Sequence, residues 1–197
     1  IQMKIRDWLF SKKKQREKPE VIWLEETTST NAIVAELVGL SFSVEPNKAF
    51  YVAIPDDREK AQRLVDIFKP LYENPDILKI GQNIKYDLEV LAGYGVTLAG
   101  NMWDTMIAHY LIQPELRHNM DYMAEVYLNY KTIHIDELIG PKGKNQRSMR
   151  SLPPKDVYLY ACEDADITLR LKNLLEPKLQ EAGLTELFYQ IEMPLVP

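Results

Sequence analysis

Three apolar runs follow one another closely near the start of the chain, and short polar segments separate them. The runs are Val21–Leu24, Leu37–Val44 and Ala49–Ile54, and they are rich in the branched and aromatic residues that favour strands. The segment between the second and third runs contains Pro46-Asn47, which is typical of a turn. Because the connections are short, the pattern predicts an antiparallel meander.

After Pro55 the apolar period lengthens to between three and four residues, which predicts helices. Helical spacing extends over Ala61–Leu71, Leu88–Tyr94, Thr105–Ile112, Met120–Tyr127 and from Pro153-Pro154 through Leu175. Short apolar runs at Ile77–Gly81 and Met102–Asp104 predict two further strands, and residues 3–17 predict an N-terminal helix. The fold class is therefore α/β, with a mixed five-stranded sheet (an antiparallel meander plus parallel strands) flanked by helices.

Length and composition limit the classes of protein that the chain can represent. Its 197 residues fit one domain, and no apolar run approaches the roughly 20 residues of a membrane-spanning helix. The single cysteine, Cys162, cannot form an internal disulfide, which favours the cytoplasm. The chain begins at Ile1 rather than at Met, which we interpret as a fragment of a longer protein, expected to be monomeric.

The net charge of −5 argues against binding of nucleic acid by bulk electrostatics, but it allows a narrow site for a strand end. Two basic stretches interrupt the acidic composition. The first, from Lys12 to Lys18, is interpreted as a solvated surface run. The second lies among glycines and predicts a mobile basic loop that can touch a phosphate backbone; it contains Lys142, Lys144, Arg147 and Arg150.

Acidic residues stand beside the ends of predicted elements. Glu26 ends the first strand, Asp87 begins the helix after the fourth strand, and Asp164 lies in the last helix. Tyr160 is four residues before Asp164 and shares its helix face, whereas Asp166 points elsewhere and is expected to be a surface or packing carboxylate. Converging carboxylates repel unless cations neutralise them, and they suit Mg²⁺ or Mn²⁺.

Three segments that contain these residues resemble the motifs of the 3′–5′ exonuclease (proofreading) domain of bacterial family A DNA polymerases. The family motifs are Phe-Asp-Thr-Glu-Thr, Gln-Asn-x-Lys-Tyr-Asp and Tyr-Ala-x-Glu-Asp-Ala-Asp. The corresponding segments here are Trp23–Thr27, Gln82–Asp87 and Tyr160–Asp166. The similarity extends over nearly everything from Val21 onward, and the tyrosine in the third motif is typical of the tyrosine branch of the Asp-Glu-Asp-Asp exonucleases.

The resemblance implies a ribonuclease H-like fold and two-metal hydrolysis at a DNA 3′ end. It implies that Glu26 and Asp164 ligate the first metal and that Asp87 holds the second. It further implies that Glu26 contacts the terminal nucleotide and that Tyr160 orients the attacking water. The positions implied to contact the single strand are Gln82, Asn83 and Tyr86.

The first motif departs from the family at Leu24, where the family has an aspartate that bridges both metals. Side chains alternate along a strand, so Leu24 and Glu26 are expected to face the site together while Glu25 faces away. Glu25 is therefore not expected to replace the missing ligand, and activity is expected to be impaired or absent. The substitution is compatible with a natural loss of proofreading and with an engineered change.

The resulting interpretation assigns residues 1–20 to an N-terminal helix and basic turn. Residues 21–197 form the exonuclease-like domain, which ends where a polymerase domain would begin. The expected partners are a single-stranded DNA 3′ end and the polymerase domain of the same chain, with no membrane. Two alternatives stay open: a non-catalytic scaffold or DNA-binding module, and a ribonuclease D-like enzyme that trims RNA.

Overall fold

The computed structural model describes residues 20–196, so the predicted N-terminal helix over residues 3–17 and the first basic stretch lie outside the described residues. Five strands form one sheet in the order β3-β2-β1-β4-β5. Their bounds are β1 Glu20–Thr27, β2 Leu37–Glu45, β3 Lys48–Ala53, β4 Leu78–Gly81 and β5 Met102–Asp104. The first three pair antiparallel, and β1, β4 and β5 pair parallel. The predicted mixed sheet is therefore confirmed.

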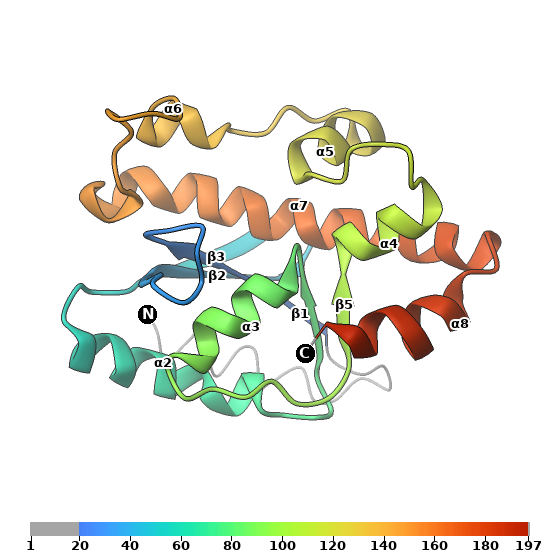
Figure 1. Ribbon diagram of the computed structural model, residues 1–197, viewed down its shortest axis with the longest axis horizontal. Helices are drawn as coiled ribbons and strands as arrows, with labels where there is room; N and C mark the ends of the chain where they lie inside the picture. The colour runs from blue at the N-terminus through green and yellow to red at the C-terminus, as the bar shows by residue number, and fades with distance from the viewer. Residues whose placement is uncertain (1–19, 197) are drawn as a thin grey trace.

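Helices cover both faces of this sheet. In Figure 1, α7 crosses one face, with α5 and α6 beyond it, and α2 lies on the other side. The helices are α2 Arg58–Tyr72, α3 Ile84–Ala92, α4 Thr105–Ile112, α5 Met120–Leu128, α6 Ile135–Ile139, α7 Pro154–Glu181 and α8 Thr185–Leu187. A 3₁₀ helix at Met149–Ser151 lies between α6 and α7. A π-helix at Phe188–Glu192 and a 3₁₀ helix at Met193–Leu195 follow α8.

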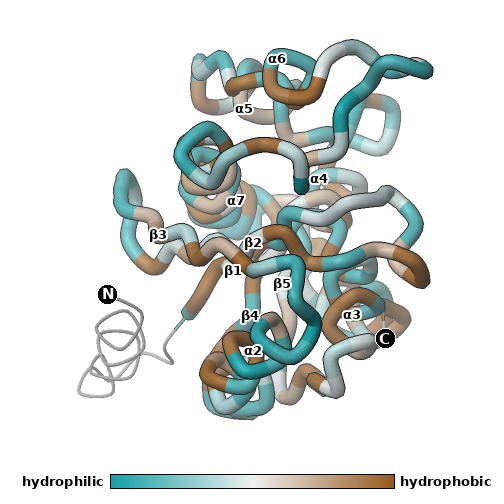
Figure 2. The backbone as a smooth tube through the Cα atoms, turned by 90° about the vertical axis from the view of Figure 1, so that its left-hand side faces the viewer, coloured by the Kyte–Doolittle hydropathy of each residue, from teal (hydrophilic) through white to brown (hydrophobic). Residues whose placement is uncertain are grey.

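Alternation along β1 and β2 produces two different packing layers. Trp23 and Phe42 are paired across the strands and fully buried, and they pack against the aromatic residues Phe68 and Tyr72 of α2. The alternate positions of β2 hold Gly39, Ser41 and Ser43. These small residues allow α7 to lie close to the sheet, so the deep apolar layer is on the α2 side. Figure 2 shows the sheet between these helix layers.

Two helices differ from their predicted bounds. Helix α3 begins at Ile84 rather than near Leu88, because Asp104 of a neighbouring strand accepts a hydrogen bond from the Ile84 backbone N–H. Helix α7 continues past Leu175 and through Pro177 to Glu181. A proline removes one donor, and buried contacts on both sides of it, including Leu179, keep the helix together. Within residues 20–196, no helix combines the length and apolar character needed to cross a bilayer.

Lys172 of α7 fastens the start of β1 to that helix. Its Nζ is 2.9 Å from Glu20 Oε1 and 2.8 Å from Glu176 Oε2, and the side chain is 3% exposed. We expect Lys172→Met to lower the free energy of unfolding by about 2 kcal/mol, because two carboxylates lose their shared cation. Urea denaturation measures this loss. The exposed Lys155→Met on the same helix is the control, and an equal loss in both variants would contradict the assignment.

Candidate active site

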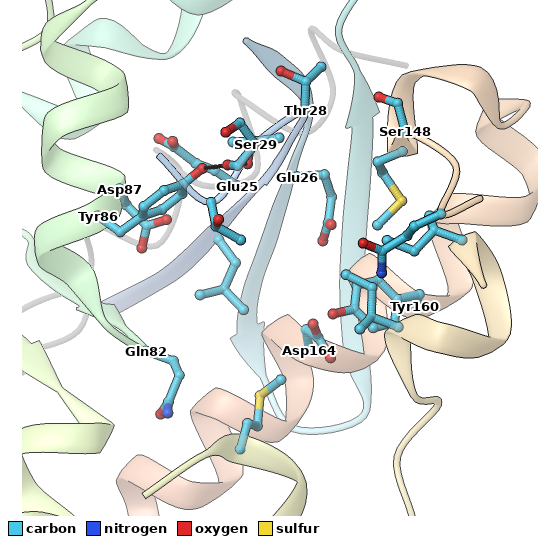
Figure 3. Close-up of a pocket in the computed structure, with 18 of the residues that line it drawn as sticks. Glu25, Glu26, Thr28, Ser29, Gln82, Tyr86, Asp87, Ser148, Tyr160 and Asp164 are labelled. Carbon is cyan, nitrogen blue, oxygen red and sulfur yellow. Dashed lines mark hydrogen bonds between the residues drawn. The ribbon is translucent and has the colours of Figure 1, made fainter. Parts of the chain in front are cut away.

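A pocket of about 480 Å³ opens at the carboxyl end of β1, between that strand, α3 and α7. Figure 3 shows Glu26 of β1 on the same side as Tyr160 and Asp164 of α7, with Tyr86 and Asp87 of α3 across from them. The β1–β2 loop and the segment before α7 complete the lining, with Thr28, Ser29, Thr30, Gln146, Arg147, Ser148 and Met149 among its residues. The structure therefore brings together all four residues predicted to be catalytic.

The pairing of β1 fixes which side chains face each wall. Leu24 pairs with Ser41 and Glu26 pairs with Gly39 along one register, which shifts only after Glu26. No slip occurs at Leu24, so Leu24 and Glu26 share a face and the predicted alternation is confirmed. The absence of a side chain at Gly39 makes room for the ring of Tyr51, since a Cβ there would lie 2.2 Å from that ring, whose pKa the charge of Glu26 helps to raise.

The wall formed with α7 contains two buried carboxylates and a neutral phenol. Burial raises the pKa of Glu26 to about 7. Burial, followed by the charge of Glu26, raises the pKa of Asp164 well above its usual range. The Tyr160 hydroxyl donates a hydrogen bond to Asp164, and burial together with this carboxylate raises the pKa of Tyr160. Tyr160 therefore keeps its proton and acts as a donor that can orient a ligand, not as a base.

The opposite wall depends on Asp104, whose role the sequence analysis did not identify. Asp104 is 1% exposed and accepts hydrogen bonds from Ile84 N at 2.6 Å and Met106 N at 2.7 Å. One carboxylate thus caps both α3 and α4, and it sets the position of Asp87. Burial raises the pKa of Asp87, with Asp104 and Glu26 as the next causes. An aspartate directly before a predicted helix was the signal in the sequence.

Glu25 is the second residue that the sequence analysis did not place at the site. Its side chain leaves β1 on the face opposite Leu24, as predicted, yet it still lines the pocket. Burial and the charge of Asp87 raise the pKa of Glu25. The expectation that Glu25 points to the opposite side of β1 from Leu24 and Glu26 is therefore confirmed, and the residue also contributes to the lining at the end of the strand.

The residues predicted to contact DNA divide into two groups. Gln82 and Tyr86 line the pocket, and each is held in place. Gln82 Nε2 donates to the His118 carbonyl at 3.0 Å, and the Tyr86 hydroxyl hydrogen-bonds to Thr27 Oγ1 at 2.5 Å. Asn83 lies outside the lining. It is exposed, with a left-handed backbone (φ 62°) directly before α3, so its place is explained by the turn it forms.

The second basic stretch, from Lys142 to Arg150, was predicted to be able to touch a phosphate backbone, and one of its residues is engaged elsewhere. Arg150 donates to the carbonyls of Leu37 at 2.5 Å and Ile54 at 2.6 Å, so it joins the pocket wall to the sheet. The prediction that Arg150 is available to a phosphate is therefore wrong. Arg147 lines the pocket, while Lys142 and Lys144 are exposed.

Asp166, which was expected to be a surface or packing carboxylate, and the histidines His109 and His118 all have packing roles in the structure. Asp166 accepts a hydrogen bond from Asn47 N at 2.5 Å and lies 3.5 Å from Arg170, so it joins α7 to the β2–β3 turn. His109 Nδ1 lies 2.8 Å from His118 Nδ1, and its Nε2 lies 3.0 Å from the Tyr127 hydroxyl. These histidines fasten α4 to α5 and to the loop between them.

The sequence of this chain matches a known protein family. A family described as "3′–5′ exonuclease" matches residues 10–180, which include all three motif segments. The chain belongs to this exonuclease family. This match confirms the resemblance on which the sequence interpretation depends.

The curated relatives of this exonuclease chain are longer proteins, and the chain matches one part of each. The DNA polymerase I of Pseudomonas aeruginosa is 39% identical over 198 residues, which cover 93% of this chain and 21% of that protein. The DNA polymerase I of Borreliella burgdorferi is 35% identical, over 86% of this chain and 18% of that protein. The chain thus spans about a fifth of the length of these relatives.

Two solved structures have the same fold as this chain. Escherichia coli RNase D superimposes with a TM-score of 0.74 at 16% identity, over 99% of this chain and 47% of that chain. Brucella melitensis NrnC with bound Mg²⁺ superimposes with a TM-score of 0.67 at 24% identity, over 88% and 79% of the two chains. These similarities confirm the expected ribonuclease H-like fold.

The exonuclease pocket has the ligand chemistry of a divalent-metal site but not the arrangement of the expected ion pair. Its carboxylate oxygens suit Mg²⁺ or Mn²⁺. Leu24, however, offers no oxygen at the position where the resemblance implies a bridging carboxylate. In the described part of the chain, no three acidic, histidine or cysteine side chains converge closely enough to enclose a metal ion. The two-ion arrangement therefore does not fit this chain.

Burial of Glu26 predicts a stability that depends on pH. Its pKa is raised from 4.5 to about 7, so between these values the folded chain holds a proton that the unfolded chain has lost. We expect the free energy of unfolding in EDTA to fall as pH rises from about 5 to about 7, by up to about 3 kcal/mol from this group. Denaturation at several pH values measures the fall.

Glu26→Gln removes the titrating group and is expected to flatten this dependence, whereas the exposed Glu89→Gln on α3 is expected to keep it. Unchanged steepness in Glu26→Gln would show that Glu26 does not hold a proton in the folded state.

Proposed function

We propose that this chain is the exonuclease domain of a DNA polymerase I in which hydrolysis at DNA 3′ ends is strongly impaired. The observation that carries the proposal is Leu24, an apolar side chain on the same face of β1 as Glu26, at a position where the family has an aspartate. Losing one of a set of carboxylates removes a full charge and a direct bond to metal. Coupled catalytic groups lose most of their effect when one is removed.

The pocket is proposed to receive the end of a single strand. In this chain, Glu26 and Asp164 supply negative charge on one wall, and Tyr160 supplies a neutral donor to the same region. Gln82 and Tyr86 are fixed by hydrogen bonds and form the floor against which an unpaired end would lie.

The chain is proposed to act within a longer protein. Residues 21–197 would form the exonuclease domain, with residues 1–20 as its N-terminal extension and a polymerase domain as its covalent partner. The DNA polymerase I relatives support this context, since the chain aligns with about a fifth of each. A cytoplasmic location and a monomeric domain follow from the same context.

A second candidate function is binding of single-stranded DNA without cleavage, and the residues that line the pocket support it. The strand-end residues Gln82 and Tyr86 and the basic Arg147 are all present on the lining, although the ligand at position 24 is lost. The domain would then hold single strands or support the polymerase domain. Trimming of RNA is less well supported, because the similarity to RNase D is at 16% identity and concerns the fold.

A nuclease assay tests the proposal directly. We expect Leu24→Asp to increase release of a 3′-terminal label from single-stranded DNA in Mn²⁺ by about 10³-fold or more over the parent, because it restores a carboxylate on the Glu26 face. The initial rate of label release is the measurement, and a parallel assay with labelled RNA tests the ribonuclease alternative.

Leu24→Asn is the matched control, since asparagine has the size of aspartate without its charge, and it is expected to stay close to the parent. Equal cleavage by the parent and by Leu24→Asp would overturn the proposed impairment. If neither cleaves DNA but the parent binds a single strand, the non-catalytic function is favoured.

A further inference from the structure

Gln82 lies at one end of the pocket, and hydrogen bonds hold both polar atoms of its side chain (Figure 3). Nε2 donates to the backbone carbonyl of His118 at 3.0 Å, and Oε1 accepts from the hydroxyl of Thr105. Thr105 is fully buried at the start of α4. The His118 carbonyl belongs to the loop between α4 and α5, which is exposed from Gln113 to Arg117. The position of Gln82 therefore depends on what fixes this loop.

A pair of histidine rings fixes the loop. His109 Nδ1 lies 2.8 Å from His118 Nδ1, and the centroids of the two rings are 4.9 Å apart. His109 is fully buried in α4, and its Nε2 lies 3.0 Å from the hydroxyl of Tyr127 on α5. His118 thus meets a ring that two helices hold in place. The contacts form one chain, from Tyr127 through His109 and His118 to Gln82 in the pocket.

The contact between the two Nδ1 atoms depends on how many protons the pair holds. One nitrogen must carry a hydrogen and the other must accept it, which two neutral imidazoles achieve. One added proton keeps the contact, because a charged imidazole donates to the bare nitrogen of its neutral partner. A second added proton puts N–H groups on both sides and two positive charges at 2.8 Å. The loop loses its anchor at that step.

The surroundings of the pair resist the second proton. Burial, followed by the charge of His118, lowers the pKa of His109. Tyr127 is a neutral phenol, because burial raises its pKa, and Lys178 of α7 lies 6.0 Å over the Tyr127 ring. The second proton therefore enters only below the usual range of histidine, about pH 6.5. The other titratable or charged groups on the elements packed against α4 and the loop are Asp104, Glu115, Arg117, Lys172 and Tyr189.

We propose that His109 is a positioning residue for the pocket, which acts through His118 to hold Gln82, and that double protonation of the histidine pair releases Gln82. This role deepens the proposed function and rests on it in one point, that Gln82 contacts the strand end. A donor and an acceptor that are fixed before binding hold a ligand more tightly than free ones. The pocket should therefore bind a single strand less tightly when the pair is broken.

Nuclear magnetic resonance of the intact chain follows the device directly. The side-chain amide signal of Gln82, identified by its absence in Gln82→Ala, should shift between about pH 7.5 and pH 5. Its midpoint should equal that of the second protonation of the two rings, read from their ¹⁵N signals. The amide of Gln62, which Asp66 and the Tyr94 carbonyl hold, is the control signal and should not follow this midpoint.

Two substitutions of His109 separate polarity from titration. His109→Phe keeps a ring without hydrogen-bonding atoms, so the Gln82 signal should be displaced already at neutral pH. His109→Asn keeps a polar atom near the position of Nδ1 but does not titrate, so the Gln82 signal should stay close to that of the parent and lose its dependence on pH. Circular dichroism checks that each variant is folded, and His109→Asn carries the comparison if His109→Phe does not fold.

Fluorescence anisotropy with a short labelled single strand of DNA in EDTA measures the effect on binding. We expect His109→Phe and Gln82→Ala each to weaken binding by about fivefold at neutral pH, the scale of one hydrogen bond. The double variant should bind no more weakly than Gln82→Ala, because His109 acts through Gln82. Val65→Ala, a core change in α2 across the sheet, controls for a general loss of stability and should bind like the parent.

Three results would overturn the role of His109. They are a Gln82 signal that ignores the titration of the histidines, additive losses in the double variant, and an equal loss of binding in Val65→Ala. A different result would count against the proposed function: if Gln82→Ala binds like the parent, Gln82 does not contact the strand end. The resonance signals would then still decide whether the pair holds Gln82, so the two failures are distinguishable.

Discussion

The crowding of carboxylates at the end of β1 is the constraint on which the rest of this pocket depends. Burial is the first cause that raises the pKa of each of them, and neighbouring carboxylates add to the effect for all but one. Such groups would separate in an open structure, because like charges in a dry region repel. Here the sheet and the helices on both sides hold their backbones in place. The pocket is therefore built to accept positive charge, and its stability depends on what neutralises it.

Leu24 acts on this constraint in two ways. An apolar side chain at the end of a strand removes one repelling charge and packs well, so the fold does not suffer from the change. The same side chain removes the oxygen that would connect the two walls. Because the adjacent residue Glu25 leaves the strand on the opposite face, the charge is conserved while its geometry is not. We therefore expect the fold of this domain to be retained whether or not the domain is active.

Hydrogen bonds between residues far apart in the chain hold α7 and the segments beside it in place. Glu163 of the third motif accepts hydrogen bonds from Tyr130 Oη at 2.7 Å and from Ile133 N at 2.6 Å, which fixes the chain between α5 and α6. Arg150 joins the segment before α7 to the carbonyls of Leu37 and Ile54. Glu163 and Arg150 therefore act on the shape of the pocket by fixing backbone segments around it.

The sequence by itself determined the strands, the helices, their order and the absence of an oxygen at Leu24, since periodicity and residue chemistry are local properties of the chain. It also indicated that Glu26, Asp87, Tyr160 and Asp164 belong together, because their motifs resemble those of one family. Only the tertiary structure decided that Glu25 and Asp87 line the same pocket, that Asp104 caps two helices, and that Arg150 donates to backbone carbonyls. Those outcomes depend on contacts between residues far apart in the chain, and strand alternation alone does not reveal how far a pocket extends around a strand's end.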